Sequence, residues 1–210
     1  PYFLEGNSKN NQDNFKSKLK RFYTKFIIKN FVDEITVNAS KNKERVLSNL
    51  DFESKVFYCG VDSLEDFKIH KFKKTPRINL LTTGVFLPYR NYETSIDIVK
   101  KINLKGLECS LDIIGETSWD QEYSKKIKSL VSENGLQDFI TIHGQVDEDK
   151  FKSLFDDTDI FLFLNIDQSW GLVVFEAMSV GFPTIVSESV GAVEILNNEV
   201  AIITNPEDVS

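Results

Sequence analysis

The 210-residue sequence has only two cysteines, two histidines and no long apolar segment. Cys59 and Cys109 lie far apart and outside any Cys-x-x-Cys pair, which excludes a disulfide scaffold and disfavours zinc ribbons and thioredoxin chemistry. No apolar run reaches the ~18 residues of a membrane-spanning helix. Because Pro1 opens the sequence without a signal-peptide pattern and the last residues read as a turn, we expect a fragment of a longer protein from the reducing cytoplasm.

Charge is unevenly spread along the chain. It carries 25 basic and 32 acidic residues, a formal net charge of −7, which argues against general nucleic-acid binding. Within residues 1–30, however, seven Lys/Arg accompany two acidic residues. Phe15, Leu19, Phe22 and Phe26 fall on one face of a helix predicted over 8–30. We interpret it as a core-facing helix with a solvated basic face; the alternative is contact with an anionic membrane surface.

Periodicity predicts two units joined by a lysine-rich linker at 63–76. Before the linker, a helix at 40–50 separates two short strands. After Pro76, predicted strands cover 78–87, 111–114, 139–142, 159–164, 184–186 and 201–204, and predicted helices cover 91–102, 119–130, 147–155, 171–180 and 193–197. This alternation predicts an α/β fold with a doubly wound parallel sheet. Such sheets bind ligands where their strands end, so chemistry is expected in those turns.

The richest of these turns runs from Asn165 to Gly181. A polar loop leads to Gly171, where a helix begins, and the unpaired amide groups of a helix start attract anions such as a diphosphate. Glu176 follows more than one helical turn later, at a distance that suits a ribose diol. The alternative, that Glu176 only caps or pairs within its helix, stays open on residue chemistry alone.

Several blocks together resemble the retaining nucleotide-sugar glycosyltransferases of family 4 (glycosyl transferases group 1), which have the GT-B fold. The segment Q-S-W-G-L-V-V-F-E-A-M-S-V-G-F-P resembles the family's E-x7-E signature and the A-M-x-x-G-x-P that follows it. Four more segments resemble the other motifs of the family and occur in the family's order. They are G-V-F-L-P-Y-R-N, L-D-I-I-G-E, I-T-I-H-G-Q-V and S-V-G-A-V-E. The resemblance implies that 1–75 ends a first Rossmann-like domain on the acceptor side. It implies that 76–210 is the nucleotide-sugar domain, truncated at its C-terminal end.

The resemblance also implies roles for individual residues. Arg90 would neutralise the donor diphosphate, Gln168 stands at the first motif glutamate, and Glu176 would hold the ribose. Further donor-binding positions implied by the match are Gly84, Gly115, Glu116, His143, Gly144, Gly171 and Leu172. His143 equally fits a loop histidine satisfied by the protein itself, Arg90 a solvated turn charge, and Glu194 either a sugar contact or a helix cap.

Three positions depart from the family pattern. Gln168 replaces a glutamate, Val85 an arginine and Asn91 a glycine, while neighbouring Asp167 is expected to point elsewhere. With no histidine cluster, we predict no metal site and no cofactor beyond the donor itself. The expected activity is that of a metal-independent hexosyltransferase that transfers a sugar, with retention, to a glycan, lipid or other acceptor. The alternatives are a GT-B nucleotide-sugar epimerase and a non-catalytic nucleotide-sugar-binding domain.

Overall fold

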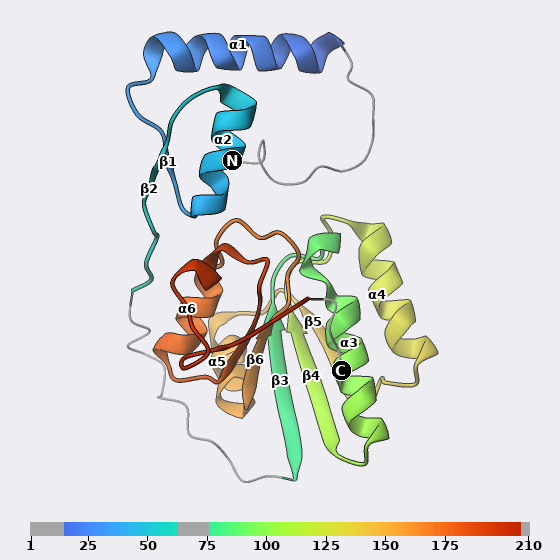
Figure 1. Cartoon of the computed structure of the whole chain (residues 1–210). Coiled ribbons are helices and arrows are strands. Elements are labelled where there is room, and N and C mark those ends of the chain that lie inside the picture. The colour runs from blue at the N-terminus through green and yellow to red at the C-terminus, as the bar shows by residue number, and fades with distance from the viewer. Residues whose placement is uncertain (1–14, 63–75, 207–210) are drawn as a thin grey trace.

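The computed structural model describes residues 15–62 and 76–206, arranged as a small first unit and a larger second unit (Figure 1). The first unit contains helix α1 (Phe15–Phe31), strand β1 (Thr36–Val37), helix α2 (Ser40–Leu50) and strand β2 (Lys55–Val56). Its two strands pair in parallel. Both are shorter than the strands that the sequence predicts over 34–38 and 55–59, and most of the predicted linker, 63–75, lies outside the described residues.

The second unit alternates strands and helices, as the sequence predicts. Its strands are β3 (Arg77–Thr83), β4 (Glu108–Ile114), β5 (Ile140–Gly144), β6 (Ile160–Phe163), β7 (Thr184–Ser187) and β8 (Ile202–Thr204). Its helices are α3 (Tyr92–Leu104), α4 (Gln121–Glu133), α5 (Glu148–Asp157) and α6 (Leu172–Ser179), with 3-10 turns η1 (Pro88–Arg90) and η2 (Gly191–Glu194). All neighbouring strands are parallel, in the order β5-β4-β3-β6-β7-β8.

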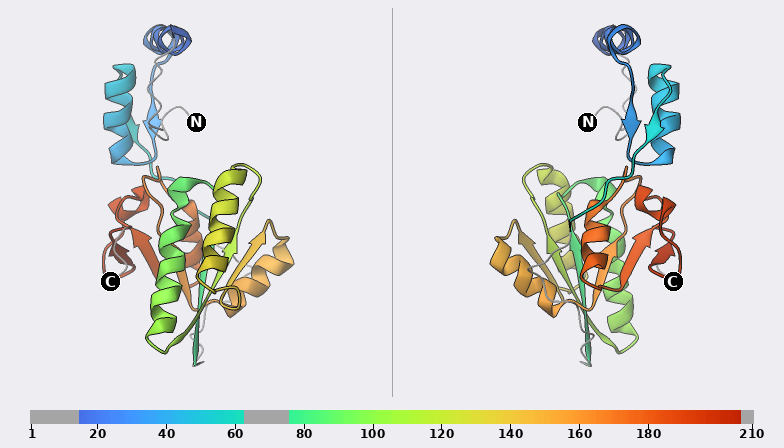
Figure 2. Two further views of the ribbon diagram at one scale, coloured as in Figure 1. Left: turned by 90° about the vertical axis from the view of Figure 1, so that its right-hand side faces the viewer. Right: turned by 90° about the vertical axis from the view of Figure 1, so that its left-hand side faces the viewer.

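Each face of the six-stranded sheet is buried under helices (Figure 2). In β3, Leu80 packs with residues of α3 and α4, whereas Leu81 packs with residues of α5 and α6. Successive side chains of a strand point to opposite faces, so a nearly continuous apolar strand belongs between two helical layers. This explains why β6 is apolar throughout and lacks the alternating polar residues of a half-exposed strand.

Three local predictions were wrong. The strand predicted over 78–87 ends at Thr83, because Gly84 turns the chain with a φ of 147°. Trp119 lies before α4 and is 57% exposed, so it does not belong to that helix's buried face. The apolar face of α1 is not core within the described residues, because Phe22 and Phe26 are 66% and 52% exposed.

No described helix combines the length and the apolar character needed to cross a membrane.

Candidate functional site

A pocket opens where the strand order reverses. The chain runs outward from β3 to β4 and β5, then returns to place β6 on the other side of β3. Parallel sheets bind ligands in the crevice at such a switch point. The pocket, of about 330 Å³, is lined by residues that include Asn38, Cys59, Arg90, Gln168, Gly171 and Leu172. Since Asn38 and Cys59 come from the first unit, both units contribute to it.

Arg90 brings positive charge to this pocket. It ends η1, and its guanidinium lies 5.9 Å from the Phe163 ring centroid and 5.1 Å from that of Tyr89. Its Nε is buried without a hydrogen-bond partner, and no carboxylate of the described residues pairs with it. A stacked guanidinium that retains unused donors suits phosphate oxygens. The interpretation of Arg90 as a solvated turn charge is therefore not favoured.

Asn91, where the family pattern has glycine, keeps the backbone that glycine would allow. Its φ of 55° lies in the left-handed region, which asparagine tolerates better than most residues. Its side-chain amide donates to the carbonyl oxygens of Leu164 and Pro206, at 3.2 and 2.8 Å. Asn91 therefore holds the turn that carries Arg90 against the end of β6.

The start of α6 forms another wall of the pocket. Gly171 caps the helix with a φ of 115°, and a Cβ there would lie 3.0 Å from Phe163 and 3.1 Å from Val190. Glycine is thus needed at this position for backbone conformation and internal packing. Leu172, the first helical residue, is 42% exposed and lines the pocket.

Gln168 and Glu176 differ in their surroundings. Gln168 lines the pocket, and its Oε1 accepts a hydrogen bond from Asn165 Nδ2 at 3.2 Å. Glu176 sits on α6, half-buried, and none of the described residues donates to its carboxylate. It lines neither this pocket nor the next one described. Its assignment to a ribose stays a prediction.

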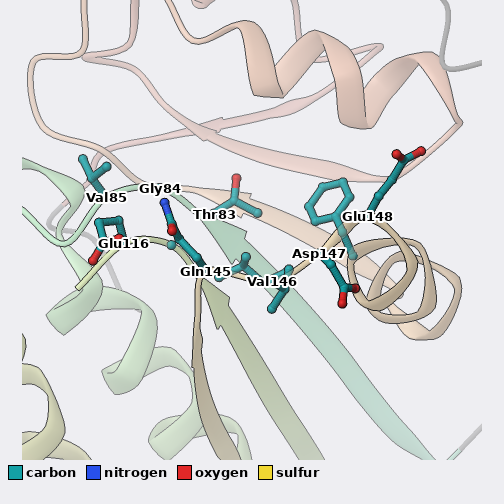
Figure 3. A pocket seen from close by; sticks show the side chains of 11 residues that line it. Thr83, Gly84, Val85, Glu116, Gln145, Val146, Asp147 and Glu148 are labelled. Carbon is teal, nitrogen blue, oxygen red and sulfur yellow. The ribbon is translucent and has the colours of Figure 1, made fainter. Parts of the chain in front are cut away.

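A second pocket, of about 400 Å³, lies at the ends of β3, β4 and β5 (Figure 3). Gly84, Gly115 and Glu116 line it, and backbone hydrogen bonds join its loops: Gly84 N–H donates to Ile114 O, and Gly115 N–H to Gly144 O. The loops are in close contact, since a Cβ on Gly115 would lie 1.8 Å from the carbonyl oxygen of Gly84. A Cβ on Gly84 would meet the Arg90 guanidinium at 2.5 Å, so Arg90 stands between the two pockets.

His143 is satisfied within the protein. Its Nε2 lies 2.6 Å from Asp112 Oδ1 on the neighbouring strand β4. Neither His143 nor Gly144 lines the second pocket, whereas the next two residues, Gln145 and Val146, do. The geometry therefore favours the alternative of a loop histidine with a structural partner over a phosphate or sugar contact.

Glu194 joins the two units. The backbone N–H groups of Ser40 and Lys41, at the start of α2, donate to its carboxylate at 2.7 and 3.2 Å. The Tyr58 hydroxyl also lies 3.3 Å from Glu194 Oε2. The α2 N-cap residue is Ala39, which has no side-chain acceptor of its own. Glu194 is thus a helix cap, as one alternative allowed, but for a helix about 150 residues away.

Further contacts hold the loop at 165–171 against the first unit. The Asp167 carboxylate pairs with Arg45 and lies 3.6 Å from Lys41 Nζ, and Asp167 does not line the pocket that Gln168 lines. The Trp170 ring stacks on Tyr58 at 5.1 Å, and its Nε1 donates to Cys59 O. Sequence analysis missed these contacts.

Two Asp-x-Asp sequences escaped the sequence analysis. They are Asp147-Glu148-Asp149 and Asp157-Thr158-Asp159. Asp147 caps α5 by accepting from the Lys150 N–H, and Asp159 accepts from the Asn79 N–H. Across 15–62 and 76–206, no three His, Cys, Asp or Glu side chains gather as metal ligands.

Comparison with solved structures gives the protein class: the second unit is a Rossmann-like domain of the GT-B glycosyltransferase fold. The chain matches Anabaena Alr3699/HepE, solved in complex with UDP and glucose, with a TM-score of 0.74 and 16% identity over 92% of this chain and 55% of that one. It matches a sucrose-phosphate synthase from Thermosynechococcus elongatus with a TM-score of 0.72 and 20% identity over 94% of this chain and 52% of that one.

Sequence comparison gives the family. Residues 62–210 match Glycosyl transferases group 1, and the chain belongs to this family. It is 27% identical over 202 residues to the O-antigen chain mannosyltransferase RfbU of Salmonella typhimurium, covering 93% of this chain and 53% of RfbU. It is 26% identical over 181 residues to the mouse GDP-Man:Man(3)GlcNAc(2)-PP-Dol alpha-1,2-mannosyltransferase, covering 79% and 37%. The chain thus spans about half the length of these relatives, or less.

Proposed function

We propose that the protein transfers a sugar from a nucleotide-diphosphate sugar to a glycan or lipid-linked glycan, with retention of configuration, as in family 4. One observation carries the proposal: the unpaired Arg90 guanidinium and the start of α6 line the same pocket at the switch point of the sheet. Membership of a glycosyltransferase family and relatives named as mannosyltransferases support it. The acceptor class follows from those relatives' names, which include O-antigen and PP-Dol.

The proposed role of each residue follows from where negative charge develops during the reaction. As the bond between the sugar C1 and the β-phosphate oxygen breaks, its electron pair stays on the phosphate. The acceptor oxygen bonds to C1, and its proton passes to the departing phosphate oxygen. Arg90 and the amide groups at the start of α6 stabilise the departing diphosphate, since donors already in place act most strongly where charge develops. In this proposal these groups supply the positive charge, with neither a metal nor a separate cofactor; Glu176 holds the ribose and Gln168 a sugar hydroxyl.

Donor binding by Arg90 variants tests the proposal. Calorimetric titration with UDP, GDP and ADP should show binding of one nucleotide. Because the Arg90 guanidinium makes charge-assisted bonds, Arg90→Ala should weaken that binding about ten- to a hundredfold, and Arg90→Lys less. Thr24→Ala, on the distant α1, is the control. A folded parent chain that binds no nucleotide, or an Arg90→Ala variant that binds as well as the parent, would reject the donor site.

A non-catalytic nucleotide-sugar-binding domain is the second candidate. It is favoured by Gln168, whose amide carries no charge and already contacts Asn165, and by Val85 at the place of an arginine. Gln168→Glu separates the two in a transfer assay with the complete protein. If the protein is an enzyme, the parent should transfer sugar measurably and the variant should do so at a changed rate. If it is a binding domain, the parent should transfer no sugar but should still bind the donor.

We place the reaction at the cytoplasmic face of a membrane. On α1, Phe22, Phe26 and Phe31 are more than half exposed beside Lys25 and Lys29, and aromatic and basic side chains together favour an anionic lipid surface. Vesicle flotation of the chain should show binding to anionic vesicles but not to neutral ones. Phe22→Ser together with Phe26→Ser should abolish it. No flotation with anionic vesicles would leave α1 as a surface for other protein segments.

A further inference from the structure

We propose that Tyr58 is a positioning residue for the donor pocket. Its ring, stacked on Trp170, holds the pocket wall that the first unit supplies against the wall that the second unit supplies. The inference rests on the proposed function, since it concerns the same pocket at the start of α6. Tyr58 does not line that pocket, so it acts through Trp170 and not through a contact with the donor.

The two units share this pocket of about 330 Å³. Asn38 and Cys59 line it from the first unit, whereas Arg90, Gln168 and Gly171 line it from the second. The shape of the pocket therefore depends on how closely the two units approach each other. A ligand held by Arg90 is enclosed by the whole lining only while the first-unit wall stays in place.

Trp170 connects the two walls. Its ring is 3% exposed and lies against rings from both units, with centroids 5.1 Å from Tyr58 and 5.3 Å from Phe175 of α6. Its Nε1 donates to the carbonyl oxygen of Cys59 at 2.8 Å. Trp170 also comes directly before Gly171, which caps α6. A displacement of the first unit therefore acts on the residue that precedes the helix start.

The main chain around Trp170 is held from the second unit. The Gly191 N–H donates to Gln168 O at 3.0 Å, and the Ala192 N–H donates to Trp170 O at 3.1 Å. These bonds do not involve the Tyr58 side chain, so they remain when Tyr58 is changed. A change at Tyr58 therefore loosens the first-unit wall and leaves the second-unit wall in place.

The stack differs in kind from the polar contacts between the units. The pairing of Asp167 with Arg45 and the bonds to Glu194 are partly exposed, and exposed polar pairs contribute little because water replaces them. A stacked aromatic pair shifts an equilibrium by about three- to tenfold. If fewer molecules have both walls in place, the apparent Kd for the ligand rises by the same factor. Loss of the Tyr58 ring should therefore weaken donor binding.

Titration calorimetry on Tyr58 variants of the chain tests the inference, with whichever of UDP, GDP and ADP binds the parent. Tyr58→Ala should weaken that binding about three- to tenfold. Tyr58→Phe keeps the ring and loses only the hydroxyl contact with Glu194, so it should bind within about twofold of the parent. Phe57→Ala is the matched control, since it truncates the neighbouring ring, which is 69% exposed, and it should also bind within about twofold.

Tryptophan fluorescence measures the stack without a ligand. The chain has two tryptophans, so Trp119→Phe leaves Trp170 as the single reporter. In that background, Tyr58→Ala should shift the Trp170 emission to the red and let acrylamide quench it more strongly, with an unchanged circular dichroism spectrum. If Tyr58→Ala does not fold, Tyr58→Leu takes its place in the binding experiment. It keeps an apolar side chain without a ring to stack, and it should weaken nucleotide binding at least about threefold.

The outcomes separate this inference from the proposed function. A folded parent chain that binds none of the three nucleotides overturns both. A folded Tyr58→Ala variant that binds within about twofold of the parent overturns the inference and leaves the donor site standing. Binding as weak in Tyr58→Phe or Phe57→Ala as in Tyr58→Ala also overturns it, because the cause would then be the hydroxyl or a general loss of apolar surface. Unchanged quenching of Trp170 in Tyr58→Ala overturns it as well, because Tyr58 would not hold the Trp170 ring.

Discussion

The contact between Glu194 and α2 gives a prediction whose size follows from the structure. Two backbone N–H groups at the start of α2 have no acceptor in Ala39 and use the Glu194 carboxylate instead. Losing a helix cap destabilises proteins by about 0.5–2 kcal/mol. Because Glu194 is exposed, we expect about 1 kcal/mol for Glu194→Ala, and less for Glu194→Gln, which keeps an acceptor. For a chain of this size that corresponds to a fall in Tm of roughly 2–4 °C.

The assay is thermal unfolding followed by circular dichroism, with two further variants. Ala39 has φ −153° and ψ 148°, the extended conformation of a capping residue, so Ala39→Ser in the Glu194→Ala background supplies a local acceptor. It should restore most of the lost Tm. Glu188→Ala, an exposed glutamate of the same region, is the control and should unfold with the parent. If Glu194→Ala unfolds at the parent's temperature, or if Ala39→Ser restores nothing, the capping argument is wrong.

The pH dependence of the same difference follows from the pKa of Glu194. Partial burial acts to raise this pKa, but the N–H groups of Ser40 and Lys41 outweigh burial and hold it below its ordinary value of 4.5. A carboxylate with a lowered pKa stabilises the folded chain above its unfolded pKa and stops doing so as pH falls through the folded pKa. The Tm difference between parent and Glu194→Ala should therefore be complete at pH 7 and shrink below pH 4.5.

Three further predictions concern other contacts. Gly115→Ala should lower the free energy of unfolding by more than about 2 kcal/mol in urea titrations, since its Cβ would overlap a backbone carbonyl; a parent-like midpoint would contradict that packing. Asp167→Asn should lower the same quantity by at most about 1 kcal/mol, with the loss fading in high salt, because its pairing with Arg45 is partly exposed; an effect that salt does not change would point to another cause. Ellman titration of the folded chain at pH 8 should count one thiol, because Cys59 is exposed while burial raises the pKa of Cys109 to about 11; two fast thiols would refute this.

Much of the second unit could be predicted because its signals are local. The apolar segments within β3 and β6 indicate that both faces of the sheet are buried, and the glycine after Ile114 marks the end of β4. The predicted ends of strands and helices were wrong where a local signal was ambiguous. Apolar Phe86 and Leu87 prolonged the predicted strand past Gly84, although Phe86 is buried from a loop rather than from the sheet.

The candidate site was predictable only in part. Arg90, Gln168 and Gly171 follow strands that end at one edge of the sheet, so topology and family resemblance together predict that they meet, and the structure places them in one pocket. The Glu194–α2 contact joins residues about 150 positions apart, and periodicity carries no information on such a pairing. Likewise, nothing in the sequence shows that His143 already has Asp112 as its partner.

The hydrogen-bonded loops at Gly84, Gly115 and Gly144 have a consequence for engineering. Because the floor of the second pocket is held by main-chain atoms, exchanging the side chains around its rim leaves the floor intact. The shape and charge of this pocket could then be changed by a small combinatorial library at Val85 and Gln145, without redesign of the backbone. Screening such a library for ligand binding would sample new side-chain arrangements on an unchanged main chain.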